Sequence, residues 1–129
     1  IESAIANEYG TDSVASYYGA TSSEDRVNIV ERFQDMQSPL RFFVGQPKTG
    51  GYGITITAAS TMIYYSNSYD LESRLQSEDR IHRIGQKNFC TYIDFVTPGT
   101  VDEKILKALR SKINIADEVL GEEGKQWLI

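Results

Sequence analysis

The chain has few of the residues that form covalent or metal cross-links. Its 129 residues include one cysteine, Cys90, and one histidine, His82. A single cysteine excludes an intramolecular disulfide and a multi-cysteine metal site, and it is typical of a reducing, intracellular compartment. We therefore expect no metal ligands. The length suits one domain, and 40% hydrophobic residues can build a core without cross-links.

The chain also lacks long apolar runs and an excess of positive charge. No run approaches the roughly 20 residues that a membrane-spanning helix needs, so we expect no membrane partner. Asp and Glu outnumber Lys and Arg by 18 to 13, giving a formal net charge of −5. A freestanding nucleic-acid binder usually has a basic face. The charge disfavours that class but allows DNA contact through a groove shared with another domain.

Apolar spacing predicts helices that alternate with strands. Helices are expected over residues 1–9, 21–36, 71–84 and from 100 onward, with a last helical segment ending at 121. Strands are expected over residues 13–18, 40–44, 61–65 and 91–96, and the strand over 40–44 (LRFFV) should be buried and central. Capping patterns at 21–24 (TSSE) and 100–103 (TVDE) mark two helix starts. This alternation predicts an α/β fold with a mostly parallel sheet.

The segment LQSEDRIHRIGQ, residues 75–86, concentrates arginine in an acidic chain. On a helix, Gln76, Arg80 and Arg83 would share one face, because they lie at positions i, i+4 and i+7. Two guanidinium groups and an amide on one face form a receptor for a multiply charged anion. Arginine suits phosphate because its planar fork donates two hydrogen bonds and keeps its charge.

A second interpretation of this segment is a solvent-exposed helix face with internal ion pairs, and spacing alone favours it. Arg74 with Glu78, and Asp79 with Arg83, lie one helical turn apart. His82 has no second histidine, so we expect it to hydrogen-bond within the domain rather than bind a metal.

The segment PKTGGYGITIT, residues 47–57, contains three glycines within four residues after a predicted strand. Such loops let backbone approach a ligand closely. It does not match the Walker A pattern, and its KTG tripeptide lacks the SxxK partner found in β-lactamase-type enzymes. The alternative is a tight turn without chemistry.

Taken together, these segments resemble the second lobe of the Swi/Snf-type ATPases of helicase superfamily 2. QSEDRIHRIGQ is similar to the last motif of that family, which reads roughly Q-x-x-D-R-x-H-R-I-G-Q. TGGYGITITAASTMIYY, YYGATSSEDRVNIVERF and TVDEKIL resemble other family segments in the right order, so the resemblance covers nearly the whole chain. It implies one three-layer RecA-like domain over residues 1–129, with trailing helices over 100–121 that pack on it.

The resemblance also implies how the chain meets its nucleotide. In the family, ATP and Mg are held mainly by a first lobe, whose phosphate loop is not in this sequence. By motif match, Arg80 and Arg83 would be arginine fingers, and Gln76 the glutamine beside them. Gly51 and Gly53 would form a loop near the nucleotide. The chain would then be half of an ATPase and inactive alone.

Duplex DNA and the N-terminal lobe of the same protein are the partners that the resemblance implies. Lys48, Thr49 and Gly50 lie where the family approaches the DNA backbone. The sequence departs from the family at 46–51, where STRAGG is usual, and at 69–71, where WNP is usual. These departures bear on DNA contact rather than on nucleotide chemistry.

The family's first strand, which would precede Ile1, is not in this sequence. We therefore expect an unpaired edge beside the strand over 40–44, and self-association of the chain through that edge. Two alternatives stay open: a non-catalytic helicase-like interaction module, and a lobe of an RNA helicase. The ending HRIGQ favours the Swi/Snf side. The motif wording suggests a bacterial or phage protein.

Overall fold

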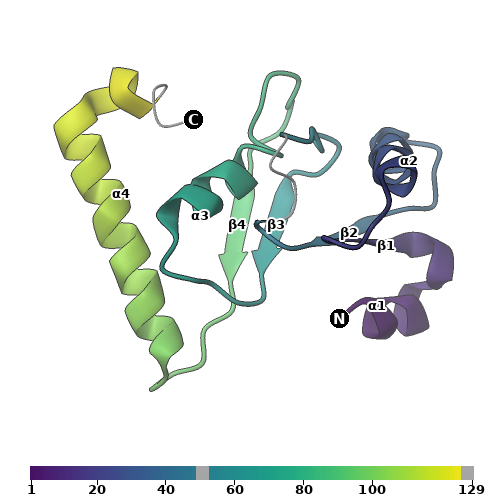
Figure 1. The fold of residues 1–129 in the computed structure, drawn as a ribbon, viewed down its shortest axis with the longest axis horizontal. Helices are drawn as coiled ribbons and strands as arrows, with labels where there is room; N and C mark the ends of the chain where they lie inside the picture. Colours follow the sequence, from purple (N-terminus) through teal and green to yellow (C-terminus); the bar gives the residue numbers. More distant parts are fainter. Residues whose placement is uncertain (49–52, 126–129) are drawn as a thin grey trace.

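The structure, a computed structural model, describes residues 1–48 and 53–125, with helices and strands that alternate along the chain (Figure 1). In order, the elements are α1 (Glu2–Tyr9), the 3-10 turn η1 (Thr11–Ser13), β1 (Val14–Tyr17), α2 (Ser23–Gln34), β2 (Phe42–Gly45), β3 (Thr61–Tyr64), α3 (Leu71–Glu78), β4 (Thr91–Asp94) and α4 (Val101–Lys125). The four predicted strands are all present, and the α/β class is confirmed.

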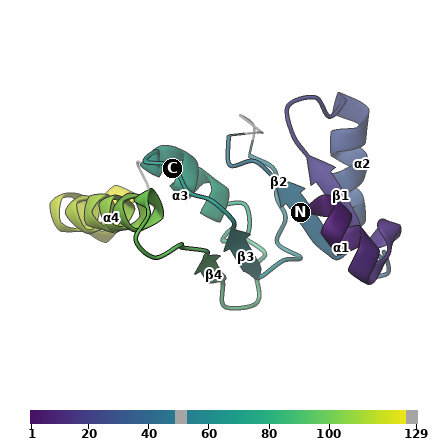
Figure 2. The ribbon, with the colours of Figure 1, turned by 90° about the horizontal axis from the view of Figure 1, so that it is seen from below.

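The strands pair in parallel, as predicted, and they form two pairs. β1 pairs with β2 in the register Val14↔Phe42, and β3 pairs with β4 in the register Thr61↔Thr91. Figures 1 and 2 show β2 and β3 as the inner strands of the two pairs. Within the described ranges no strand hydrogen-bonds to the inner edge of either one.

The strand predicted over 40–44 is shifted and less buried than expected. It begins at Phe42, and Phe42, Phe43 and Val44 are each only half-buried. β1 covers one edge of this strand, while its other edge has no strand partner among the described residues. The prediction of a fully buried central strand is therefore wrong for this structure.

Helix α2 begins one residue later than its predicted capping pattern. The side-chain oxygen of Ser22 accepts a hydrogen bond from Asp25 N at 3.1 Å, so Ser22 is the cap. Thr21, the predicted cap, instead accepts from Tyr18 N. The helix ends at Gln34, ahead of the predicted end at Met36, because Asp35 already has extended backbone angles.

Helix α4 is one long element that lies beside α3 (Figure 1). Thr100 Oγ1 accepts from Asp102 N at 3.2 Å, which confirms the predicted start. The helix then continues to Lys125, so the prediction of a separate last helix is wrong. Ile105 and Leu109 are buried and hold α4 against the domain. No helix in residues 1–48 and 53–125 has the length and hydropathy to cross a membrane.

The hydrophobic core lies where α2, the segment before β3 and the segment after α3 meet. Its buried members are Phe33, Leu40, Ile56 and Ile81. Ile81, only 1% exposed, belongs to the predicted arginine segment. The core therefore fixes the main chain that carries the candidate site.

Candidate functional site

The helix expected to carry the site ends halfway through the motif. α3 stops at Glu78, and residues 79–85, here called the arginine turn, continue as successive turns to Gly85. Gly85 has φ +102°, a conformation that favours glycine. The predicted helix to Ile84 is therefore wrong in its second half.

Hydrogen bonds from outside the helix explain why α3 ends there. A longer helix would use Arg80 O to accept from the main chain four residues later. Instead, Arg80 O accepts from Ile56 N at 2.9 Å, and Ile81 O accepts from the Gln86 side chain at 3.0 Å. Ile81 N bonds to Glu78 O, three residues back, which tightens the turn.

Both arginines of the turn point their donors at the glycine-rich segment. Arg80 is buried, and its Nη2 donates to Pro47 O at 2.9 Å. Arg83 is exposed, and its Nη1 donates to Gly53 O at 3.2 Å. A Cβ added to Gly53 would lie 3.3 Å from Arg83 Nη1, so glycine keeps this approach open. The two arginines thus hold the two described ends of one loop.

Gln76 is not part of this arrangement. It is exposed on α3, and its Nε2 donates to Glu72 Oε1 at 2.9 Å. The predicted face shared by Gln76, Arg80 and Arg83 does not exist, because the arginines lie beyond the end of the helix.

Three predicted site residues, Thr49, Gly50 and Gly51, lie outside the described residues. Lys48 is described, and its side chain is 72% exposed. Its Nζ lies 3.3 Å from Oδ2 of Asp70, the N-cap of α3. The predicted DNA-facing lysine is thus close to the helix that leads to the arginine turn.

Burial gives Arg80 an unusual electrostatic setting. Desolvation lowers the pKa of its guanidinium, while Tyr17 and Tyr64, the last residues of β1 and β3, act in the opposite direction. Arginine still keeps its charge at neutral pH. Arg80 therefore brings a positive charge to the carboxyl ends of the strands, the edge at which parallel sheets usually bind ligands.

The alternative of an ion-paired helix face is only partly confirmed. Arg74 and Glu78 form the expected pair at 2.6 Å. No ion pair joins Asp79 to Arg83, although both side chains are described. The ring of His82 is exposed and has no hydrogen-bond partner among the described residues, so the prediction of a hydrogen-bonded histidine is wrong.

Arg74 is the centre of a polar network that the sequence revealed only in part. Its guanidinium bonds to Asp94 Oδ1 and to Asn67 Oδ1, and it lies 3.6 Å from the ring centroid of Tyr64. Burial lowers the pKa of Arg74, but the hydrogen bonds to Asp94 and Glu78 outweigh it and raise that pKa. The network fixes α3 to the end of β4, directly ahead of the arginine turn.

Tyr64 closes the network on its buried side. Its hydroxyl lies 2.6 Å from Ser77 Oγ, and burial raises its pKa to about 12. Tyr64 is thus a neutral core residue.

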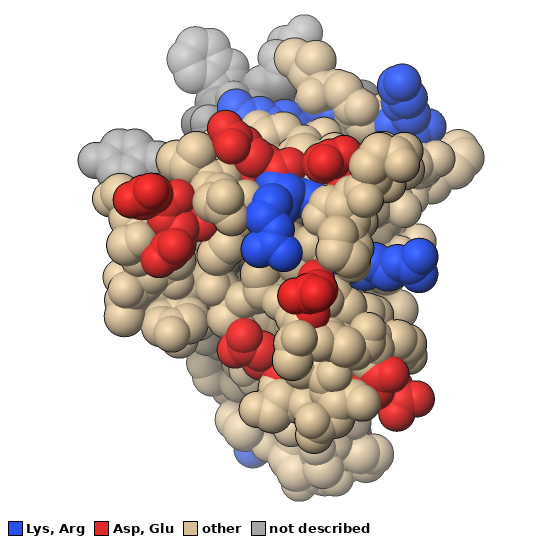
Figure 3. Space-filling model, turned by 90° about the vertical axis from the view of Figure 1, so that its right-hand side faces the viewer, with Lys and Arg blue, Asp and Glu red and all other residues tan. Residues whose placement is uncertain are grey.

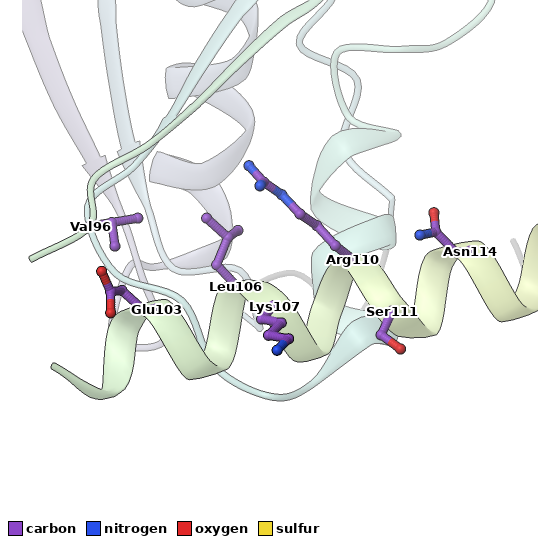
Figure 4. Close-up of a pocket in the computed structure, with 7 residues that line it drawn as sticks. All are labelled: Val96, Glu103, Leu106, Lys107, Arg110, Ser111 and Asn114. Carbon is purple, nitrogen blue, oxygen red and sulfur yellow. The ribbon is translucent and has the colours of Figure 1, made fainter. Parts of the chain in front are cut away.

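Two hollows accompany these groups. A small one of about 20 Å³, room for about one water, lies at the ends of β2 and β3 and is lined in part by Pro47, Tyr64 and Arg74. A larger one of about 520 Å³ runs along α4 (Figure 4), lined by Val96, Glu103, Leu106, Lys107, Arg110, Ser111 and Asn114. It contains no residue of the arginine turn, and its charges are of both signs, so we do not take it as the site.

The surface charge is mixed on the side of the molecule that carries α1 and α2. Figure 3 shows Lys and Arg interspersed with Asp and Glu across that face. Within the described residues, this face offers no continuous basic patch. No cluster of three or more His, Cys, Asp or Glu suited to a metal ion occurs in the described part of the chain.

Comparison with known proteins identifies the domain family of the chain. Residues 2–85 match the model of the helicase conserved C-terminal domain. The chain is 32% identical over 102 residues to the ATP-dependent helicase brm of Drosophila melanogaster, covering 79% of this chain and 6% of that protein. It is 34% identical over 110 residues to the putative ATP-dependent helicase/translocase YwqA of Bacillus subtilis, covering 85% of this chain and 12% of that protein.

Among solved structures, the C-terminal part of the Fun30 ATPase domain superposes with a TM-score of 0.74 at 24% identity, covering 84% of this chain and 34% of that one. That likeness confirms the RecA-like α/β fold. The match to the domain model covers most of the chain, and it ends at Gly85, the last residue of the arginine turn. The chain therefore belongs to the helicase conserved C-terminal domain family.

Proposed function

We propose that residues 1–129 act as the second lobe of a DNA-stimulated ATPase that translocates on duplex DNA. In this proposal, Arg80 and Arg83 reach the phosphates of an ATP held mainly by a first lobe. The chain spans only a small part of its curated relatives, 6% of brm and 12% of YwqA. The first lobe would therefore lie elsewhere in a longer protein.

The observation that carries the proposal is the meeting of two arginines at one loop. Their main chain is fixed by the core at Ile81 and by the bond from Ile56 N to Arg80 O. Their guanidinium groups donate to the neutral carbonyls of Pro47 and Gly53. A phosphate adds a negative charge and can accept two parallel N–H bonds from a guanidinium, which a neutral carbonyl cannot, so phosphate oxygens can replace these carbonyls.

The chemistry required of this chain is charge stabilisation. As the γ-phosphoryl group leaves, negative charge spreads over its oxygens, and arginine donors aimed there increase the rate by about 10³–10⁵-fold in other NTPases. Bound Mg would neutralise part of the same charge. The described residues contain no acidic cluster for it, so the first lobe would supply its ligands.

Because the arginines and the nucleotide would come from different lobes, hydrolysis would require the lobes to close. Arg80 and Arg83 also hold the ends of the loop that contains Lys48. If either arginine left its carbonyl, Pro47 O or Gly53 O, to bind phosphate, that end of the loop would lose its hydrogen bond to the arginine. Lys48, Thr49 and Gly50 would contact DNA phosphates, so this exchange would couple hydrolysis to DNA contact.

Gln76 has a smaller role in the proposal. It would have to leave Glu72, to which it bonds at 2.9 Å, before it reached the nucleotide. Its exposure on α3 permits that movement. We expect Gln76 to assist the arginines rather than to replace either one.

The experiment that tests the proposal is the ATPase activity of the two-lobe protein with Arg83→Ala and Arg83→Lys. Arg83→Ala should lower kcat by about 10³-fold with a smaller change in ATP affinity. Arg83→Lys should restore little, because an ammonium group cannot reproduce the planar fork. Near-normal turnover in either variant would remove Arg83 from this role.

The same assay separates the alternatives. A two-lobe protein that binds partners but never hydrolyses ATP would be a helicase-like interaction module. Stimulation by RNA and not by duplex DNA would indicate an RNA helicase lobe.

A further inference from the structure

Gln86, directly after the arginine turn, makes several hydrogen bonds from its side chain to main-chain groups. It is half-buried, and its own N–H donates to Arg83 O at 2.9 Å, which closes the turn. Gly85 before it takes a positive φ, so the chain can reverse and bring the amide back under the turn.

The amide nitrogen of Gln86 is surrounded by carbonyl oxygens. Nε2 lies 2.7 Å from Ala59 O, 3.0 Å from Ile81 O and 3.2 Å from Thr57 O. Oε1 accepts from Asn88 N at 3.0 Å. Acceptors at one end and a donor at the other define which end is the amide NH₂. The site thus requires a neutral side chain that donates and accepts.

These bonds join two segments that are distant in the sequence. Thr57 and Ala59 lie between Gly53 and β3, whereas Ile81 lies between the two arginines. Among the described residues, Gln86 is the one side chain that hydrogen-bonds to the main chain of the arginine turn. The turn has two further anchors, the buried Ile81 side chain and the bond from Ile56 N to Arg80 O.

We propose that Gln86 is a positioning residue for the arginines. It holds the Ile81 carbonyl, and with it the main chain between Arg80 and Arg83, at a fixed place relative to the loop that the arginines bridge. This inference rests on the proposed function, because it concerns the geometry with which the arginines meet phosphate. Gln86 does not touch the phosphate itself.

The chain offers a matched control in Gln34. From α2, Gln34 Nε2 donates to Thr57 Oγ1 at 3.2 Å, and its Oε1 accepts from Ala58 N at 2.7 Å. It therefore supports the same segment before β3 with a side chain of the same type. It makes no hydrogen bond to the arginine turn. Gln34→Ala removes these hydrogen bonds to the segment before β3 and leaves the bond from Gln86 to the arginine turn in place.

The test uses the two-lobe protein with Gln86→Ala, Gln86→Glu and Gln34→Ala, and measures kcat and KM for ATP with duplex DNA. Gln86→Glu places a carboxylate against three carbonyls, so it should displace the turn most. A displacement of about 1 Å can cost about 10²-fold in rate, so we expect kcat to fall by about that factor with KM little changed. Gln86→Ala should lower kcat by about tenfold. Gln34→Ala should lower the melting temperature while kcat stays near the parent value.

A double variant distinguishes the inference from the function on which it rests. If Gln86 acts through the arginines, adding Gln86→Ala to Arg83→Ala should lower kcat far less than it does alone. An Arg83→Ala protein with normal kcat overturns the proposed function. The other outcome is that Arg83→Ala lowers kcat while Gln86→Ala has the same kcat as Gln34→Ala. That result overturns only the positioning role of Gln86. If Gln86→Glu does not fold, Gln86→Met, which keeps length without a donor, replaces it, and an undiminished kcat there overturns the role equally.

Discussion

Removing Arg74 should destabilise the domain more than removing any exposed charge. Its guanidinium bonds to Glu78 at 2.6 Å and to both carboxylate oxygens of Asp94. Arg74, Glu78 and Asp94 have side chains that are only 10%, 22% and 15% exposed. Removing one partner leaves the others as poorly solvated charges, which costs about 3–5 kcal/mol. We expect Arg74→Met to lower the free energy of unfolding by about that amount.

Asp94→Asn is the milder change at the same contact. It removes the negative charge of Asp94 but keeps an oxygen that can accept from Arg74. Hydrogen bonds to charged groups contribute about 1.5–3 kcal/mol, so Asp94→Asn should lower the free energy of unfolding by less than Arg74→Met does. Lys48→Ala is the matched control, because the Lys48–Asp70 pair is exposed. Such pairs contribute about 0–1 kcal/mol. Urea unfolding of the three variants measures how much free energy of unfolding each one loses. If Arg74→Met loses no more than Lys48→Ala, the network around Arg74 does not stabilise the domain as argued.

The pH dependence of the same variants gives an independent check. Burial raises the pKa of Asp94, but the hydrogen bonds from Arg74 and Asn67 outweigh it, so the pKa lies below its ordinary value of 3.8. A lowered folded pKa means that this stabilisation is complete above the unfolded pKa and is lost as pH falls through the folded one. In Arg74→Met the larger cause of the lowering is gone, and the hydrogen bond from Asn67 remains. The stability gap between parent and variant should therefore narrow below about pH 4, and an equal gap at pH 7 and pH 3 would contradict this.

Three further expectations concern the 129-residue chain alone. It should not hydrolyse ATP, with or without duplex DNA, because two arginines cannot position a nucleotide; DNA-stimulated turnover that copurifies with the chain would contradict this. Its binding to duplex DNA should be weak and should fall steeply with salt, because the expected contacts, from Lys48 and its neighbours, are to phosphates; a tight complex insensitive to salt would favour base readout instead. Extending the chain upstream by one strand should raise its melting temperature and reduce self-association, because the inner edge of β2 has no strand partner among the described residues. Light scattering and thermal melts test the last expectation, and a monomeric short form that melts equally high would show that no strand is needed there.

Much of the fold was predictable because its signals are local. The apolar runs TMIYY and TYIDFV became β3 and β4, and Thr100 marked the start of α4. The strand over 40–44 was predicted at nearly the right place but with the wrong burial. Its apolar residues show that the strand can be buried. How much of it is buried depends on which strand lies beside each edge, and that is a tertiary property.

The candidate site shows where local periodicity stops being informative. Spacing in LQSEDRIHRIGQ predicted a helical face, and the spacing was right for Arg74 and Glu78 inside α3. It was wrong from Arg80 onward. Ile56 N donates to Arg80 O, and the side chain of Gln86 donates to Ile81 O, so neither carbonyl accepts from the main chain of a longer helix. Neither partner can be identified from a periodicity of 3.6 residues. The glycine before Gln86 was the available signal, since a positive φ at Gly85 allows the chain to turn back and place the glutamine amide against the Ile81 carbonyl.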